Sequence, residues 1–224
     1  MEMGHQDPAK SQRKGRSAPD IPLETDGGTE ATQLTVRRLR TGQQDAQQKG
    51  GSHLVAHCTA IMSVSWRQCA IQITNECSTY DLDNPCAYME SGVCTEPLPP
   101  QIDSNSTGSA LFTKTANAAR GAVGVFTYDL IKKSTKNAIG KIAVMFCVPY
   151  DYVLYFNLYA VGIFDESQAF NNNLYQLMYY DSNSNFIRGK ATGPCLSHTD
   201  GQVTIMGTMS DSYQPVMKVV VKDN

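Results

Sequence analysis

The chain has 224 residues, a formal net charge of −2 and an apolar content of 41%, enough for one ordinary domain with an appendage. Residues 1–53 carry eight basic and seven acidic side chains, so no basic block indicates a nucleic-acid partner. The start lacks the apolar segment of a signal peptide, and the most apolar run, residues 142–164, is interrupted by Pro149, Asp151 and Asn157. We therefore expect a chain that is soluble as made and has no transmembrane helix.

The N-terminal third differs in composition from the rest. Residues 1–53 are dominated by polar, charged and Gly residues, which predicts a disordered tail. All aromatic residues lie from Trp66 onward, so we place the start of a folded domain, residues 66–224, there. The intervening residues 54–65 are compatible with a short helix or linker, because apolar residues recur there at helical spacing.

From Trp66 the pattern changes to that of strands. Cys69, Ile71 and Ile73 alternate with Ala, Gln and Thr, which is typical of a half-buried strand. Turn residues at 81–85 precede a short predicted strand at 86–90. Further strands are predicted at 110–115, 121–130, 142–147, 152–164, 203–209 and 216–222. Many short strands separated by turns predict an antiparallel β-sandwich, flanked by one or two short helices.

One helix is predicted between Glu166 and Tyr179. On a helical projection four apolar residues share a stripe that suits packing on the sandwich: Phe170, Leu174, Leu177 and Met178. Tyr175 and Tyr179 are four residues apart on an adjacent stripe, so we expect both phenols to face outward.

Seven of the eleven tyrosines fall between Cys147 and Tyr180. Each buried phenol needs a hydrogen-bond partner, so such a concentration is more typical of a surface that contacts a partly apolar, partly wet ligand. An aromatic-rich packed corner of the sandwich is the alternative.

Because no secretory signal is visible, we expect reduced thiols at the seven cysteine positions, which are 58, 69, 77, 86, 94, 147 and 195. The cysteines contain no paired Cys-x-x-Cys, so we expect no metal site. Disulfides among Cys69, Cys77, Cys86 and Cys94 are the alternative if the chain is exported by another route. Catalytic Gly-x-Ser-x-Gly, His-Glu-x-x-His and phosphate-loop motifs are absent, so we expect neither catalysis nor a cofactor.

Several separated blocks of sequence match a known family in order. They are Tyr88-Met-Glu-Ser91-Gly92, Gly121-Ala-Val-Gly-Val125, Ala143-Val-Met-Phe-Cys-Val-Pro-Tyr-Asp-Tyr152 with Tyr155, and Leu174-Tyr-Gln-Leu-Met-Tyr-Tyr180. Over residues 69–222 the chain resembles the actinoporins, the pore-forming cytolysins of sea anemones, and the actinoporin-like proteins of other animals. The resemblance implies a secreted protein that binds phosphocholine headgroups, favours sphingomyelin membranes, and self-associates on the target membrane into cation-permeable pores.

The resemblance also implies site residues. The phosphocholine site would be formed by Ser91, Val123, Cys147, Pro149, Tyr155, Tyr175, Tyr179 and Tyr180. The loop that contacts the membrane would include Tyr152, Leu154, Leu158 and Tyr159, and residues around 53–66 would insert as a pore-lining helix. A lipid- or glycan-binding module without lytic activity is the alternative function.

Overall fold

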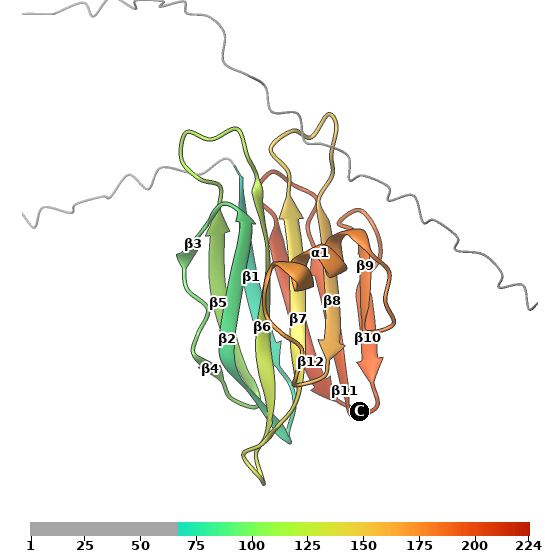
Figure 1. Cartoon of the computed structure of the whole chain (residues 1–224). Helices are drawn as coiled ribbons and strands as arrows, with labels where there is room; N and C mark the ends of the chain where they lie inside the picture. The colour runs from blue at the N-terminus through green and yellow to red at the C-terminus, as the bar shows by residue number, and fades with distance from the viewer. Residues whose placement is uncertain (1–66) are drawn as a thin grey trace, which may run out of the picture. The chain divides into compact units, whose positions relative to one another are not determined.

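The computed structural model describes residues 67–224, which fold as a β-sandwich of two six-stranded sheets (Figure 1). The first sheet has the order β10-β11-β12-β1-β5-β3, and the second has the order β4-β2-β6-β7-β8-β9. Neighbouring strands are antiparallel except for the parallel pair β1 and β12. The predicted tail at 1–53 and the possible helix at 54–65 lie outside the described residues and stay predictions.

The elements follow one another along the chain in this order: β1 Gln68–Asn75, β2 Tyr80–Ser91, β3 Val93–Glu96, β4 Gln101–Ile102, β5 Ser106–Thr113, β6 Ala122–Lys132, β7 Ala138–Val148, β8 Leu158–Phe164, α1 Asn172–Tyr180, β9 Phe186–Lys190, β10 Leu196–Asp200, β11 Val203–Met209 and β12 Val216–Asp223. The predicted sandwich is confirmed, with α1 as its flanking helix within these residues.

The sequence has alternating apolar residues in β1 and a continuous apolar run in β7, and these two patterns have different structural causes. In β1 the alternating residues Cys69, Ile71 and Ile73 point into the core between the sheets, because successive side chains of a strand face opposite sides. In β7 both sides are buried. Residues such as Ile142 and Phe146 enter the core between the sheets, while Met145 packs in a second cluster with residues of α1. Figure 1 shows α1 crossing the outer face of this sheet, which explains the continuous apolar run.

The helix is shorter than predicted. It begins after Asn171, whose side chain accepts a hydrogen bond from the backbone N–H of Asn173 and so caps the helix. The residues predicted as its first turns form a separate turn instead, in which Asp165 Oδ1 accepts from the backbone N–H and the hydroxyl of Ser167. Short polar side chains that hydrogen-bond to the nearby backbone favour turns over helix interiors. The helix therefore begins at Asn172 and not at the predicted Glu166.

Two other boundaries were predicted wrongly. The turn predicted at 81–85 lies inside β2, where a register shift between Asp83 and Cys86 and a positive φ of 51° at Asn84 mark a bulge. The strand predicted from Tyr152 begins only at Leu158. Residues 149–157 form instead the β7–β8 loop, in which Asp151 Oδ1 accepts from the backbone N–H of Val153 at 2.7 Å.

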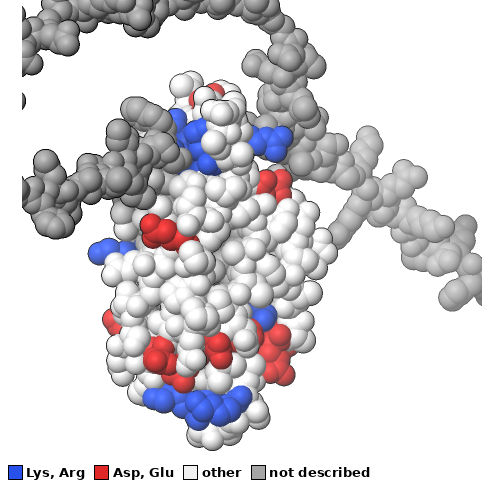
Figure 2. All heavy atoms as spheres, turned by 90° about the vertical axis from the view of Figure 1, so that its left-hand side faces the viewer, with Lys and Arg blue, Asp and Glu red and all other residues white. Residues whose placement is uncertain are grey.

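Basic side chains gather at the lower end of the domain in Figure 2, where Figure 1 places the β6–β7 hairpin. Lys133 Nζ in this hairpin donates to Ser104 Oγ at 2.8 Å, and Lys136 Nζ lies 4.0 Å from Asp81. These partners belong to the protein itself, so both lysines take part in contacts within the domain.

Cysteines 69, 77, 86, 94, 147 and 195 are free thiols. Within residues 67–224 no helix is long and apolar enough to cross a membrane.

Candidate functional site

Four tyrosines from two elements form a row of aromatic rings on the outer face of the second sheet. Tyr88 of β2 lies 6.1 Å from Tyr175 of α1, measured between ring centroids. Tyr175 lies 5.6 Å from Tyr179, and Tyr179 lies 4.7 Å from Tyr180. The first α1 contact follows from helix geometry, since residues four apart are neighbours on a helix surface. We call these four residues the tyrosine cluster.

The tyrosine cluster runs from the protein interior to the surface. Tyr175 is only 4% exposed, Tyr88 and Tyr179 are half-buried, and Tyr180 is 45% exposed. The prediction that Tyr175 faces outward is therefore wrong. The short α1 has to cover the apolar outer face of β6 and β7, so Tyr175 packs there together with Leu174 and Met178. Burial raises the pKa of Tyr175 well above its usual range.

Cys147 and Val123 lie beneath the tyrosine cluster. They are register partners in the β6–β7 ladder and pack in the same apolar group as Tyr175 and Tyr179. Burial raises the pKa of Cys147 to about 12, and the neighbouring Tyr179 hydroxyl offsets part of this rise. At neutral pH it is a protonated, packed thiol, as expected for a residue near the end of a buried strand.

The remaining three residues predicted for the headgroup site border this group. Ser91 pairs with Val123 in the β2–β6 ladder, and its Oγ donates to the backbone oxygen of Gly121 at 2.9 Å. Pro149 is buried directly after β7, whereas Tyr155 is exposed on the β7–β8 loop. Burial is the main cause that raises the pKa of Tyr179, and a smaller contribution from Tyr155 places the two side chains within electrostatic range of each other.

The β7–β8 loop presents apolar side chains to solvent. Val153 is 93% and Leu154 is 68% exposed, and Phe156 is also exposed. Lys190 Nζ lies 3.8 Å from the Phe156 ring centroid. This cation–π contact stabilises one side of the loop. Single exposed apolar residues are common, but a contiguous group on one loop marks an interaction site.

Of the four residues predicted to contact a membrane, Leu154 alone is exposed. Tyr152 and Leu158 are half-buried. Tyr159 is wrongly predicted, because it is 1% exposed, packs in the core between the sheets, and donates to backbone oxygens of Gly207 or Pro194. Val153 and Phe156 were missed, although the Asp151 position could have indicated a turn that exposes the residues after it.

The chain is similar to known proteins. The family model described as sea anemone cytotoxic protein matches residues 54–222. The chain belongs to this family, the actinoporins. The resemblance inferred from the separated sequence blocks is thereby confirmed.

Individual relatives match more narrowly. DELTA-thalatoxin-Avl1b of Actineria villosa is 33% identical over 99 residues, which are 43% of this chain and 40% of the thalatoxin. The chain thus matches less than half the length of that relative. Bryoporin of Physcomitrium patens is 28% identical over 158 residues, covering 70% of this chain and 84% of bryoporin. The crystal structure of the lipid binding protein Nakanori shares the fold with a TM-score of 0.54 at 13% identity, over 69% of this chain and 70% of that one.

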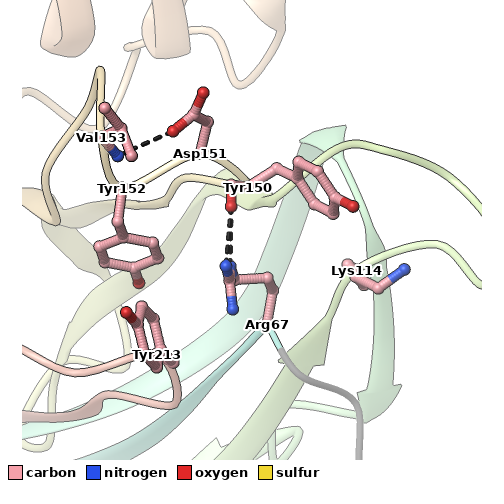
Figure 3. A pocket seen from close by; sticks show the side chains of 7 residues that line it. All are labelled: Arg67, Lys114, Tyr150, Asp151, Tyr152, Val153 and Tyr213. Atoms are coloured by element: carbon pink, nitrogen blue, oxygen red, sulfur yellow. Dashed lines mark hydrogen bonds between the residues drawn. The ribbon is translucent and has the colours of Figure 1, made fainter.

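This actinoporin has a cavity on the other side of the β7–β8 loop, which was not predicted from the sequence. Its volume is about 630 Å³, and it is lined by Arg67, Lys114, Tyr150, Asp151, Tyr152, Val153 and Tyr213 (Figure 3). The Arg67 guanidinium donates from Nε and Nη2 to the backbone oxygen of Tyr150, at 3.1 and 2.8 Å. It also lies 4.8 Å from the ring centroid of Tyr152 and 4.7 Å from that of Tyr213.

Arg67 thus joins the start of β1 to two loops that are distant in sequence. The Tyr152 and Tyr213 rings meet edge to face at 4.8 Å, and the Tyr152 hydroxyl lies 2.9 Å from the backbone oxygen of Ser212. We call this arrangement of Arg67, Tyr150, Tyr152 and Tyr213 the Arg67 clamp. It holds the base of the loop that exposes Val153 and Leu154.

Proposed function

We propose that this actinoporin binds membranes through phosphocholine headgroups, sphingomyelin among them, and self-associates there into cation-permeable pores. The observation that carries the proposal is the position of the tyrosine cluster beside an exposed apolar loop. Facing aromatic rings hold a quaternary ammonium group, each contact contributing about 0.5–2 kcal/mol depending on desolvation. The loop supplies apolar side chains that gain free energy on leaving water for the bilayer interface.

The proposed headgroup site comprises the residues implied by the family resemblance. Some of them would contact the ligand, and the others would support those that do. Tyr179 and Tyr180 offer ring surface to a ligand, and Tyr155 approaches from the loop. Val123, Cys147, Pro149 and the buried Tyr175 form the floor and support of the site. Ser91 stands at its edge, and no cofactor or catalytic group is required.

Binding is tested with the full-length protein and liposomes that contain sphingomyelin. We expect the wild type to co-sediment and the double variant Tyr155→Ala/Tyr179→Ala to lose this binding, because two ring faces are removed. The matched control, Tyr155→Phe/Tyr179→Phe, keeps the rings and is expected to bind nearly as well as the wild type. Unchanged co-sedimentation of the alanine variant would remove the headgroup site from consideration.

Pore formation needs a separate measurement. Release of an encapsulated dye from the same liposomes is expected to accompany binding, and a cation-selective conductance across a planar bilayer is expected to follow. Tight binding without leakage would instead support a lipid- or glycan-binding module without lytic activity. That alternative requires only the proposed recognition surface, whereas pore formation also requires insertion of residues around 53–66.

A further inference from the structure

A carboxylate stands at one end of the tyrosine cluster. The β2–β6 ladder shifts register between Met89 and Ser91, so Glu90 is the extra residue of a bulge. Bulges re-aim side chains, and here the Glu90 carboxylate accepts a hydrogen bond from the Tyr88 hydroxyl at 2.9 Å. The Tyr88 ring in turn lies tilted against the Tyr175 ring, as described above. The negative charge is thus tied to the first ring of the row.

No basic side chain of the described region neutralises this charge. The ion pairs among residues 67–224 join Lys136 to Asp81 and Lys141 to Asp129, and Glu90 is exposed. Its field reaches along the row. The hydrogen bond to Glu90, together with burial, raises the pKa of Tyr88, and the pKa of Tyr175 is raised mainly by burial with Glu90 contributing.

Two hydroxyl groups beside the tyrosine cluster are engaged within the protein. Ser91 Oγ donates to the backbone oxygen of Gly121, and Tyr88 Oη donates to Glu90. A phosphate group is held most strongly by cations, whereas the end of the site at Tyr88 offers a ring face and a carboxylate. Ring faces and a negative charge are the chemistry that attracts an organic cation.

We infer that Tyr88 and Glu90 extend the proposed headgroup site and that the Glu90 charge makes it favour the quaternary ammonium end of a ligand over its phosphate. This inference rests on the proposed function and adds two specificity-determining residues to its site, where a trimethylammonium group would bind. That group occurs both on a lipid headgroup and on free choline. Glu90 supplies the counter-charge, and Tyr88 supplies a ring and the hydroxyl that holds Glu90 in place.

The selectivity is tested by competition at constant ionic strength. Full-length protein is bound to sphingomyelin liposomes, and tetramethylammonium chloride, phosphocholine or inorganic phosphate is added. We expect tetramethylammonium and phosphocholine to release the protein over a similar concentration range and inorganic phosphate to have no effect. Release by inorganic phosphate, or release by phosphocholine without release by tetramethylammonium, would overturn the inference.

A titration of tyrosine and tryptophan fluorescence with free choline separates the two sources of the cation. Saturable binding of free choline together with liposome binding is the expected result. Saturable choline binding by a protein that does not bind liposomes would support the ammonium site and refute the proposed membrane function. The two hypotheses can therefore fail independently.

Variants identify the residue responsible. Glu90→Gln keeps the size of the side chain and removes its charge, and we expect about two- to fivefold weaker tetramethylammonium binding, since exposed charge contacts are modest. Glu96→Gln, an exposed residue of β3, is the matched control and is expected to bind like the wild type. Wild-type affinity of Glu90→Gln, with loss of liposome binding in Tyr179→Ala, would overturn the role of Glu90 and leave the aromatic site standing.

Tyr88→Phe provides a second variant that keeps the ring. It frees the Glu90 carboxylate, so we expect weaker binding than in the wild type. The double variant Tyr88→Phe/Glu90→Gln is expected to bind no more weakly than Glu90→Gln alone, because the hydroxyl acts through the carboxylate. Additive losses would show that the two residues act separately and would contradict this part of the inference.

Discussion

Replacing Arg67 by alanine tests how the β7–β8 loop is held in place. The substitution removes both hydrogen bonds to the Tyr150 backbone oxygen and the contacts with the Tyr152 and Tyr213 rings. It leaves the tyrosine cluster and the exposed Leu154 unaltered in sequence. A defect in this variant would therefore come from loop position and not from loss of ligand contacts.

The size of the effect can be worked out from these contacts. Two rings at 4.7 and 4.8 Å from the guanidinium contribute about 0.5–1 kcal/mol each at a partly exposed site. Hydrogen bonds from a charged donor contribute about 1.5–3 kcal/mol, and the two here share one acceptor. Allowing for non-additivity, we expect Arg67→Ala to weaken the fixed loop conformation by about 2–4 kcal/mol.

Liposome binding and urea unfolding of Arg67→Ala measure this together. If the loop becomes locally mobile, affinity for liposomes falls by at least tenfold, while the free energy of unfolding falls by less than the full clamp energy. Arg67→Lys is the control, since it keeps the charge but cannot donate two hydrogen bonds to one carbonyl in the same fork geometry; it should recover only part of the affinity. Wild-type liposome binding by Arg67→Ala would refute the assignment of the clamp as the element that positions the loop.

Two further predictions concern the loop tip and the end of the last strand. Leu154→Asp should lower liposome affinity by roughly tenfold or more, because burying a leucine contributes about 1.5–3 kcal/mol. Ile139→Asp, in an exposed residue of β7 beside the β6–β7 hairpin, is the control and should bind normally. Equal losses in both variants would contradict a specific role for Leu154. Asp223 Oδ2 accepts from the backbone N–H and hydroxyl of Ser78 at 2.6 and 2.7 Å, so Asp223→Asn should lower the free energy of unfolding by about 1.5–3 kcal/mol at neutral pH. Burial opposes ionisation of Asp223, but the hydrogen bonds from Ser78 and Thr79 outweigh it and hold its pKa below 3.8. A carboxyl group with a depressed pKa stabilises the fold at higher pH and loses this contribution as pH falls through that pKa. The difference in unfolding free energy between Asp223→Asn and the wild type, measured by urea unfolding, should therefore shrink in acid. A difference that persists well below pH 3.8 would contradict the charge-based explanation.

The sandwich could be predicted because its strands carry local patterns that survive folding. The alternation in β1 and the run in β11, Val203–Met209, report burial on one or both faces, and that burial determines which residues the strand tolerates. The continuous apolar run in β7 reports burial on both faces in the same way. Loops and helix starts were less predictable, since they depend on single side-chain bonds such as those of Asp151, Asp165 and Asn171.

The tyrosines show where local sequence stops being informative. Tyr159 was assigned to the membrane loop from the family resemblance, yet its hydroxyl donates to the backbone oxygen of Gly207 or Pro194, more than thirty positions away. Tyr175 was placed outward by helical periodicity, yet the outer face of the sheet had to be covered by a nine-residue helix. Both errors have one cause: partners that satisfy or cover a phenol come from other strands, and no local pattern encodes them.

The β7–β8 loop lies between two differently charged groups of tyrosines. On one flank Arg67 stacks on Tyr152 and Tyr213, so those rings are already occupied by a cation of the protein. On the other flank the rings that continue from Tyr88 end at a carboxylate with no basic partner in the described region. Tyrosine therefore fixes the loop on one side and, in the proposed site, would contact a ligand cation on the other. It follows that loss of the Arg67 clamp should weaken binding to all liposomes alike, whereas loss of the Glu90 charge should change the ranking of headgroups.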